Sequence, residues 1–308
     1  MHKEKPSIKG VLIREMIADI TSTSFLGESI QTGKYRMNPK EPLFLYPPRY
    51  HCKTIQLENF SLEYLKRHKE NSSFSVLQLH GGGYIGPMKN SYRKFSISYL
   101  EKCGQSDVIT IDYRVAPEHP YPAALEDAFA AYSFIVEEHL YNPGKLIIVG
   151  DSAGGGLALA LCMYLRDHGF PKPAGLVLMS PWADLTNSGE SHTTNLGLDP
   201  LFGNTTNNLL YNSSYIGDHD PKDPYLSPIF GDFTNLPPML IQVGTHEVLL
   251  SDSKEIASQT KLAGNKVKLS IYEGMFHVFQ MSGDIIPESR RAWDEVGEFF
   301  KAISGKIH

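Results

Sequence analysis

The sequence predicts an α/β protein with a mainly parallel β-sheet that is covered by helices on both faces. Short apolar segments alternate with helical patterns along most of the chain, as they do in βαβ units. Glycine-rich turns directly follow two of these apolar segments. The chain has 308 residues, of which 41% are hydrophobic, and this composition excludes a disordered or fibrous protein.

The N-terminal segment is predicted to begin with a helix over residues 8–20. Apolar side chains recur there at every fourth position, which is typical of an amphipathic helix: Ile8, Leu12, Met16 and Ile20. Residues 21 to about 50 are polar and rich in glycine and proline. This second part of the segment is therefore expected to be a loop.

The alternation of strands and helices begins near residue 75. The predicted strands are Ser75–Leu79, Val108–Ile111, Lys145–Val149, Leu176–Ser180, Met239–Val243 and Lys266–Ile271. The predicted helices cover 91–103, 123–138, 154–168, 251–263 and 288–303. A long polar stretch from about 183 to 222, with a weak helix expected near 201–215, interrupts this pattern. An insertion of this length in a compact α/β domain is usually functional, for example as a lid.

Charge and cysteine content argue against several classes of protein. A formal charge of −5 and a pI near 6.2 disfavour nucleic acid or an anionic membrane as the main partner. No segment approaches the roughly 18 apolar residues of a membrane helix, and charged residues interrupt the N-terminal apolar stretch. The three cysteines form no CxxC pair, which favours a reducing compartment: Cys52, Cys103 and Cys162. We therefore expect a cytoplasmic protein.

The segment GDSAG at residues 150–154 has the pattern G-x-S-x-G between a strand and a helix. Such a turn lifts the Ser152 hydroxyl above the sheet, where it can act as a nucleophile. It also places the N–H of Ala153 at a helix N-terminus, which favours a developing negative charge. We expect the neighbouring Asp151 to point away from the pocket and to accept a local hydrogen bond.

A second glycine-rich turn, HGGGY at residues 80–84, directly follows the strand predicted at 75–79. Three consecutive glycines let backbone N–H groups approach a ligand closely, as an oxyanion site requires. A phosphate-binding loop is disfavoured because neither G-x-x-x-x-G-K-[ST] nor G-x-G-x-x-G follows either strand.

A serine nucleophile needs a base and an acid, which in this kind of α/β enzyme follow in the order Ser, Asp or Glu, His. Glu247 follows the strand at 239–243, and His277 follows the next strand. Asp252 remains an alternative acid, although its position at the start of a helix favours a capping role. His246 precedes the acid and falls outside this order. The zinc motif H-E-x-x-H is absent, so no metal site is expected.

Together these motifs resemble the hormone-sensitive-lipase-like branch of the α/β-hydrolases, which consists mostly of bacterial carboxylesterases. The matching segments are HGGGY (80–84), DYRVAPEHPYPAALEDA (112–128), GDSAGGG (150–156) and GMFHVF (274–279). The resemblance extends from about residue 75 to the C-terminus. It implies one α/β-hydrolase domain over 1–308 with an eight-stranded, mainly parallel sheet, whose first two strands come from about 53–66. It also implies a helical cap built from about 1–50 and about 183–222.

The resemblance also implies roles for individual residues. Ser152 matches the nucleophile and His277 the base, while the N–H groups of Gly82, Gly83 and Ala153 match the oxyanion hole. His80 matches a residue that braces the glycine loop without transferring protons. The DYRVAPEHPYP block matches a structural element. Many members carry Asp where this chain has Glu247, and some carry Glu. No cofactor is implied, and family members suggest a homodimer through the outer sheet edge or the last helix.

The sequence thus predicts a serine carboxylesterase that acts on a small-molecule ester. The polar insertion lacks a large apolar segment for docking on lipid, so short acyl chains from acetyl to about hexanoyl are expected. The candidate pocket walls are Tyr84, Trp182 and Phe202. Amides or acetylated sugars are alternative substrates for the same residues. A ligand-binding protein on this scaffold, like the plant gibberellin receptors, is disfavoured because such receptors typically lose the catalytic histidine.

Overall fold

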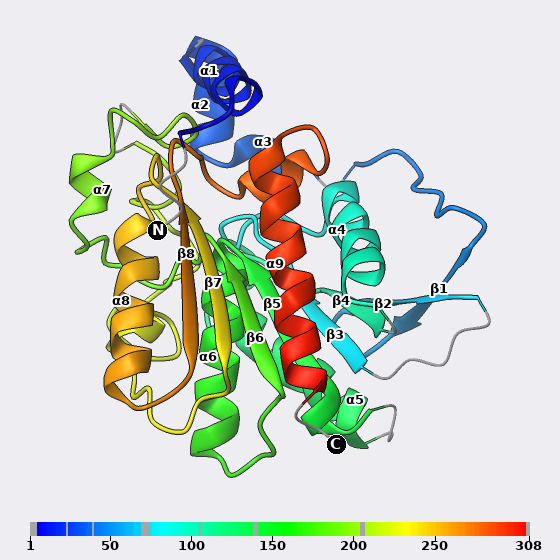
Figure 1. Ribbon diagram of the computed structural model, residues 1–308. Coiled ribbons are helices and arrows are strands. Elements are labelled where there is room, and N and C mark those ends of the chain that lie inside the picture. Colours follow the sequence, from blue (N-terminus) through cyan, green and yellow to red (C-terminus); the bar gives the residue numbers. More distant parts are fainter. Residues whose placement is uncertain are drawn as a thin grey trace.

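The computed structural model describes residues 5–22, 24–38, 40–68, 74–104, 106–137, 141–203 and 207–305. Within them, eight strands form one sheet in the order β1-β2-β4-β3-β5-β6-β7-β8 (Figure 1). The strands are β1 (Tyr50–Gln56), β2 (Ser61–Arg67), β3 (Phe74–Leu79), β4 (Ser106–Asp112), β5 (Leu146–Asp151), β6 (Gly175–Met179), β7 (Met239–Gly244) and β8 (Val267–Tyr272). The strand β2 pairs antiparallel with β1 and β4, and all other neighbours are parallel. The predicted mainly parallel eight-stranded sheet is confirmed.

The central strands are buried on both faces, so their sequences are mainly apolar rather than alternating, with Ser75, Gln78 and Gln242 as buried polar exceptions. One face packs against α4 (Asn90–Lys102) and α9 (Pro287–Ser304), with Val149 of β5 facing that layer. The other face packs against α5 (Ala123–Glu137), α6 (Ala153–Asp167) and α8 (Leu250–Leu262). Figure 1 shows α4 and α9 on the near side of the sheet. The predicted helices on both faces are thereby confirmed.

The N-terminal segment forms α1 (Ile8–Ser22), α2 (Ser24–Gln31) and α3 (Lys34–Met37), which lie above the carboxyl ends of the strands (Figure 1). The expected loop over 21–50 is therefore wrong for α2 and α3. Glycine and serine lower helix propensity, but tertiary contacts override it. At Gly33, with φ of 80°, an added Cβ would lie only 2.3 Å from Ile85 in the glycine-loop region. The turn that precedes α3 thus packs closely against the residue that follows the glycine loop.

The predicted four-residue repeat of α1 faces solvent rather than the core. Ile13 and Ile17 of this helix pack against a small cluster that includes Met275 and Phe276. The repeat itself is exposed: Ile8 by 80%, Leu12 by 62%, Met16 by 54% and Ile20 by 42%. The helix is present as expected, but it packs against the protein through a different set of side chains, which includes Ile13 and Ile17.

The insertion after β6 consists mainly of turns, with one short helix, α7 (Ser191–Thr194). The weak helix expected near 201–215 is absent from its described residues. Side chains that hydrogen-bond to nearby backbone compete with helix formation here. The Asp199 carboxylate accepts from the N–H groups of Leu201 and Phe202, at 2.8 and 3.0 Å. The Asn208 side chain accepts from Leu210 in the same way.

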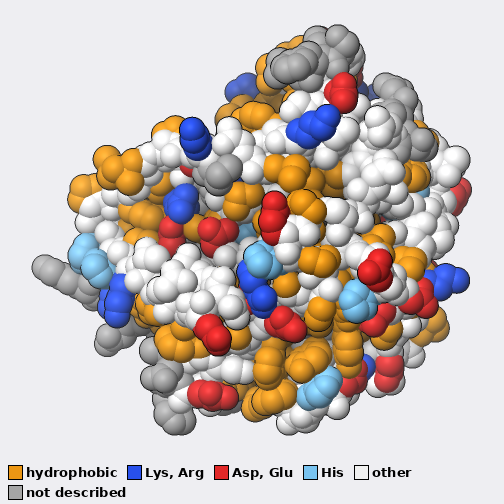
Figure 2. All heavy atoms as spheres, turned by 180° about the vertical axis from the view of Figure 1, so that it is seen from behind, with side chains coloured by type: hydrophobic (Ala, Val, Ile, Leu, Met, Phe, Trp, Pro, Cys, Tyr) orange, Lys and Arg blue, Asp and Glu red, His pale blue; other side chains and the backbone are white. Residues whose placement is uncertain are grey.

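Three 3₁₀ turns complete the described structure: η1 (Pro143–Lys145), η2 (Pro228–Phe230) and η3 (Phe279–Ser282). On the face shown in Figure 2, acidic and basic side chains are intermixed instead of forming one patch of a single sign. Among the described helices, none combines the length and the hydropathy needed to cross a membrane.

Candidate active site

Ser152 lies at the sharp turn between β5 and α6. Its backbone has φ of 53° and ψ of −124°, a strained conformation for a residue with a side chain. The flanking glycines make this turn possible. A Cβ at Gly150 would lie 2.1 Å from the Gly154 carbonyl oxygen, and one at Gly154 would lie 2.1 Å from that of Leu79. The turn thus holds the Ser152 hydroxyl at the carboxyl end of the sheet.

His277 follows β8 and brings its imidazole to Ser152. Its Nε2 atom lies 3.0 Å from Ser152 Oγ, which is hydrogen-bonding distance. The imidazole is almost fully buried, and Phe202 contacts its ring edge-on, with 5.1 Å between ring centroids. This geometry allows the imidazole to accept the hydroxyl proton.

Glu247, just after β7, lies on the other side of that imidazole. Its Oε2 atom is 3.2 Å from His277 Nδ1. Its Oε1 atom accepts hydrogen bonds from Gly244 N at 2.6 Å and from Ser180 Oγ at 2.9 Å. The side chain is fully buried, so these contacts replace water at the carboxylate. The longer glutamate arm lets one oxygen reach the strand end while the other reaches the histidine.

Asp252, the alternative acid, belongs to a different hydrogen-bonded group. Its Oδ2 atom accepts from the N–H groups of Ala183 and Asp184 at 2.9 and 3.0 Å, and its Oδ1 atom lies 2.9 Å from His192 Nε2. Burial raises the pKa of its carboxyl, although His192 opposes that rise. It does not contact His277, and the capping role expected from the sequence is wrong, because its oxygens bind these partners instead of the N-terminus of α8.

The glycine loop after β3 carries backbone donors beside Ser152. Gly82 and Gly83 have φ of 123° and 65°, and both line the same cavity as Ser152. Within the described part of the chain, the N–H groups of Gly82, Gly83 and Ala153 donate to no protein atom. His80 lies beneath the loop, with Nδ1 2.8 Å from the Gly81 carbonyl oxygen and its ring stacked on Tyr113. Burial lowers the pKa of this imidazole.

Asp151 lines the cavity, contrary to the expectation that it points away. Its carboxylate does accept a local hydrogen bond, from Gly81 N at 3.2 Å. Burial raises the pKa of this carboxyl to about 6, while the neighbouring His277 and Arg36 side chains act in the opposite direction. At neutral pH Asp151 is therefore mostly ionised.

The cavity in front of Ser152 is small, at about 40 Å³. Of the three predicted wall residues, Phe202 lines it. Tyr84 and Trp182 are buried in the core and do not, because Tyr84 stacks on Tyr215 and the Trp182 indole N–H donates to the Asp184 carbonyl. The lining residues are Arg36, Gly82, Gly83, Tyr92, Asp151, Ser152, Leu201, Phe202, Leu209, His277, Val278 and Met281.

Ser180 and Arg36 are among the residues at the site that were not predicted from the sequence. Ser180, at the end of β6, has φ of 48°, donates to Glu247 and accepts from Val278 N at 3.1 Å. It therefore links the segments that carry Glu247 and His277. Arg36 of α3 lines the cavity from the N-terminal segment. A polar residue directly after an apolar strand was a signal for Ser180, whereas no local signal marks Arg36.

The insertion after β6 is hydrogen-bonded to the loop that carries Glu247. Asn195 Nδ2 donates to the carbonyl oxygens of Glu247 and Thr245, at 2.7 and 3.1 Å. Ser191 Oγ donates to the Val248 carbonyl at 2.6 Å, and Val248 N donates to the Asp199 carboxylate at 2.9 Å. The loop that carries Glu247 is thus held by hydrogen bonds to a segment about fifty residues earlier in the chain.

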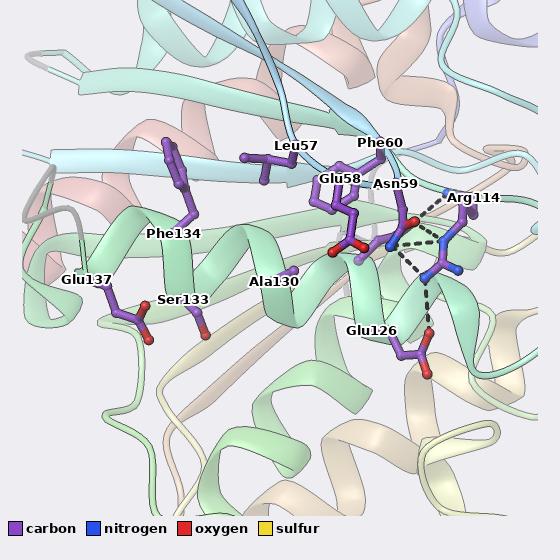
Figure 3. A pocket seen from close by; sticks show the side chains of 11 residues that line it. Leu57, Glu58, Asn59, Phe60, Arg114, Glu126, Ala130, Ser133, Phe134 and Glu137 are labelled. Carbon is purple, nitrogen blue, oxygen red and sulfur yellow. Dashed lines mark hydrogen bonds and ion pairs between the residues drawn. The ribbon is translucent and has the colours of Figure 1, made fainter.

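A separate pocket of about 470 Å³ lies between the β1–β2 connection and α5 (Figure 3). Its one arginine, Arg114, forms ion pairs with Asp127 and Glu126. Ser152, Glu247 and His277 do not line it. Among the described residues, no group of three or more His, Cys, Asp or Glu side chains is arranged to hold a metal ion.

Comparison with known proteins adds independent findings. A family model described as the alpha/beta hydrolase fold matches residues 76–281. An acetyl-hydrolase of Streptomyces hygroscopicus is 40% identical over 232 residues, which cover 75% of this chain and 77% of that protein. An esterase of Acinetobacter venetianus is 35% identical over 261 residues, covering 85% of each chain.

Solved structures resemble this one over almost its whole length. A crystal structure of an esterase from the bacterial hormone-sensitive lipase family has a TM-score of 0.82 and 31% identity, covering 97% of this chain and 99% of that one. The crystal structure of EstE5 soaked with p-nitrophenyl butyrate has a TM-score of 0.84 and 32% identity, with coverage of 96% and 99%. Both fold and sequence therefore relate the chain to esterases.

Proposed function

The chain belongs to the alpha/beta hydrolase fold family and is an ester hydrolase, and from that premise we propose that it cleaves short-chain acyl esters through an acyl-enzyme on Ser152. The observation that carries this proposal is the continuous hydrogen-bonded chain from Ser152 Oγ through the His277 ring to Glu247. A serine hydroxyl needs such a base and acid to become a nucleophile at neutral pH.

The proposed reaction proceeds in two steps. Ser152 Oγ attacks the ester carbonyl while His277 Nε2 takes its proton, and Glu247 stabilises the resulting imidazolium. The N–H groups of Gly82, Gly83 and Ala153 donate to the carbonyl oxygen as it becomes negative. His277 then gives the proton to the departing alcohol. Water, activated by the same imidazole, attacks the acyl-enzyme and releases the acid.

The unpartnered donors support the oxyanion role. Buried N–H groups without an acceptor are costly, so three of them beside one nucleophile suit a ligand oxygen that completes them. Removing one such donor from an oxyanion hole typically costs about 10²–10³ in turnover. Stabilisation of the developing charge is therefore a main source of the expected rate enhancement.

The size of the cavity supports a short acyl group. A single water needs about 10–15 Å³ of such space, so about 40 Å³ accommodates roughly three water-sized groups. Apolar side chains, including Phe202 and Leu209, form part of its wall. A relative named as an acetyl-hydrolase is consistent with this size.

Covalent labelling tests the nucleophile. A fluorophosphonate probe is expected to label the wild-type protein once per chain, and Ser152→Ala is expected to abolish labelling. Absence of labelling in folded wild-type protein, or undiminished labelling of folded Ser152→Ala, would contradict the proposed role of Ser152.

A series of p-nitrophenyl esters tests the acyl preference. We expect kcat/KM to be highest between acetyl and hexanoyl and to fall for longer chains. Phe202→Ala enlarges the cavity and is expected to shift the optimum toward longer acyl groups. Leu198→Ala is a matched control, because Leu198 lies on the same segment, is 49% exposed and does not line the cavity. Activity that rises in wild type up to dodecanoyl would contradict the short-chain proposal.

A further inference from the structure

The cavity at Ser152 adjoins a larger surface pocket of about 420 Å³. The two share Arg36 and Met281 as lining residues, so these side chains form the boundary between them. An acyl group that fills the inner cavity leaves the alcohol part of the ester to extend past this boundary. The outer pocket is therefore the space that the alcohol part would enter.

The outer pocket has an excess of positive charge. Arg36, Lys40 and Lys89 line it together with one acidic residue, Glu41. The Glu41 carboxylate accepts a hydrogen bond from Asn90 N at 2.8 Å, and the Lys89 ammonium donates to the Asn38 carbonyl oxygen. Glu41 and Lys89 thus each have a partner within the same wall of the pocket, and these hydrogen bonds fix the positions of their charged groups.

Arg36 differs from several other arginines of the molecule because its charge has no carboxylate partner. Arg93 pairs with Glu63 and Arg114 with Asp127, at 2.6 and 2.8 Å. Among the described residues, none forms an ion pair with Arg36, although this side chain is only partly exposed. Its guanidinium lowers the pKa of both Asp151 and Tyr92 against the upward effect of burial. The positive charge of Arg36 therefore acts at the cavity, where its side chain bonds to Tyr92 and no carboxylate of the described residues lies within ion-pair distance.

The position of Arg36 is fixed by the backbone around it. A Cβ on Gly86, in the turn that follows the glycine loop, would lie only 3.0 Å from the Arg36 Cβ. Gly33, which precedes α3, is fitted just as closely against Ile85. The short helix thus carries Arg36 to a defined place above the glycine loop.

We infer that the alcohol part of the substrate carries a carboxylate, which Arg36 binds at the mouth of the catalytic cavity. The planar guanidinium matches a carboxylate in two parallel hydrogen bonds. In the inner cavity the Asp151 carboxylate offsets the charge of Arg36, whereas basic residues outnumber acidic ones in the outer pocket, so the outer pocket is the better place for a negative charge. This inference rests on the proposed esterase function and adds the charge of its substrate.

Two acetate esters that differ in charge test the inference. 4-Acetoxybenzoate and 4-acetoxybenzamide have the same acyl group and nearly the same shape, but only the first is anionic. We define the charge ratio as kcat/KM for the benzoate divided by kcat/KM for the benzamide. Comparing this ratio between variants cancels the different intrinsic reactivities of the two esters.

We expect Arg36→Gln to lower the charge ratio by roughly ten- to a hundredfold, the usual effect of losing a charged hydrogen bond. Arg36→Lys is expected to restore part of it. Lys34→Gln is the matched control: Lys34 lies on the same short helix, is 67% exposed and lines neither pocket. Its charge ratio is expected to equal that of wild type. An unchanged ratio in Arg36→Gln, or an equal fall in Lys34→Gln, would overturn the inference.

A measurement on the wild-type enzyme covers the case in which Arg36→Gln does not fold. The product 4-hydroxybenzoate is expected to inhibit hydrolysis of p-nitrophenyl acetate at lower concentration than 4-hydroxybenzamide does, and added salt should weaken this inhibition. Equal inhibition by both would overturn the inference. Failure of wild type to cleave any of the three acetates would instead contradict the proposed esterase function.

Discussion

Two buried carboxylate–histidine pairs lie near each other in this chain, and only one of them reaches a serine. Glu247 and His277 are 3.2 Å apart, and Asp252 and His192 are 2.9 Å apart. The far nitrogen of His277 contacts Ser152 Oγ, whereas Nδ1 of His192 has no hydrogen-bond partner in the described structure. Burial and an acid partner are thus common to both histidines. The group on the other ring nitrogen distinguishes the proposed catalytic pair from the second pair, to which we assign a structural role.

The two acids also bind different parts of the backbone. Glu247 is held by Gly244 and Ser180 at the ends of β7 and β6. Asp252 is held by the N–H groups of Ala183 and Asp184, where the insertion begins. The first pair is therefore tied to the sheet, and the second connects α8 to the insertion. This difference predicts that replacing Glu247 lowers turnover, whereas replacing Asp252 lowers the stability of the fold.

Glu247→Gln is expected to have the largest effect. The amide can still fill the space but cannot stabilise the imidazolium, and loss of a triad carboxylate costs ~10⁴ in kcat in one well-studied case. We expect a fall of this order in kcat for p-nitrophenyl acetate, with thermal unfolding changed by only a few degrees. Activity within tenfold of wild type would contradict the role of Glu247.

Asp252→Asn tests the second pair in the same assays. Breaking a buried pair on one side typically costs about 3 kcal/mol of folding free energy. We expect urea unfolding at clearly lower concentration, while kcat of the folded fraction stays within about tenfold of wild type. A large loss of kcat without loss of stability would make Asp252 the acid after all and reverse the comparison.

Ser180→Ala removes a hydrogen-bond donor to Glu247 and therefore tests how the first pair is held in place. Ser180 donates to Glu247 and accepts from Val278, so its loss leaves the buried Val278 N–H without an acceptor and removes one of the two donors to Glu247 Oε1. Such a loss costs about 2 kcal/mol, or roughly thirtyfold in kcat if it acts on the transition state. Rescue by Ser180→Thr, together with an altered pH–rate profile in Ser180→Ala, would distinguish positioning of the triad from a general effect on packing.

Asp151→Asn examines a buried carboxylate that has no histidine directly bonded to it. Burial raises its pKa to about 6, above the ordinary value near 3.8. The folded state therefore binds the proton more tightly, so this group adds stability at low pH and loses it as pH rises through 6. Relative to Asp151→Asn, we expect wild type to lose about 1 kcal/mol between pH 5 and pH 7. A parallel pH dependence of urea unfolding in both proteins would contradict this.

Most of the fold could be predicted because its signals are local. The buried central strands are mainly apolar segments, and glycine-rich turns mark where β3 and β5 end. Ser152 and His277 were identifiable for the same reason, since Ser152 directly follows β5 and His277 lies in the turn after β8. The helices α2 and α3 were missed because their stability comes from contacts with distant loops, which propensity cannot register.

Side-chain direction was the part of the site that the sequence could not provide. Tyr84 adjoins the glycine loop, but its φ of 60° turns it beneath the loop onto Tyr215, away from the cavity. Asp151 neighbours the nucleophile and faces the cavity after all. Arg36 lies more than a hundred residues before Ser152 in the chain, so only the tertiary structure brings them together.

The hydrogen bonds between the insertion and the loop that carries Glu247 limit which parts of this enzyme can change when its substrate range changes. Asn195, Ser191 and Asp199 hold the loop that carries Glu247, so we expect any change of length between residues 191 and 199 to displace Glu247, the proposed acid, as well. A library that varies substrate range through this segment would therefore lose most of its members to inactivity. Randomising α3 and the residues after it, which reach the site through Arg36, separates selectivity from the reaction itself and is the better starting point for directed evolution.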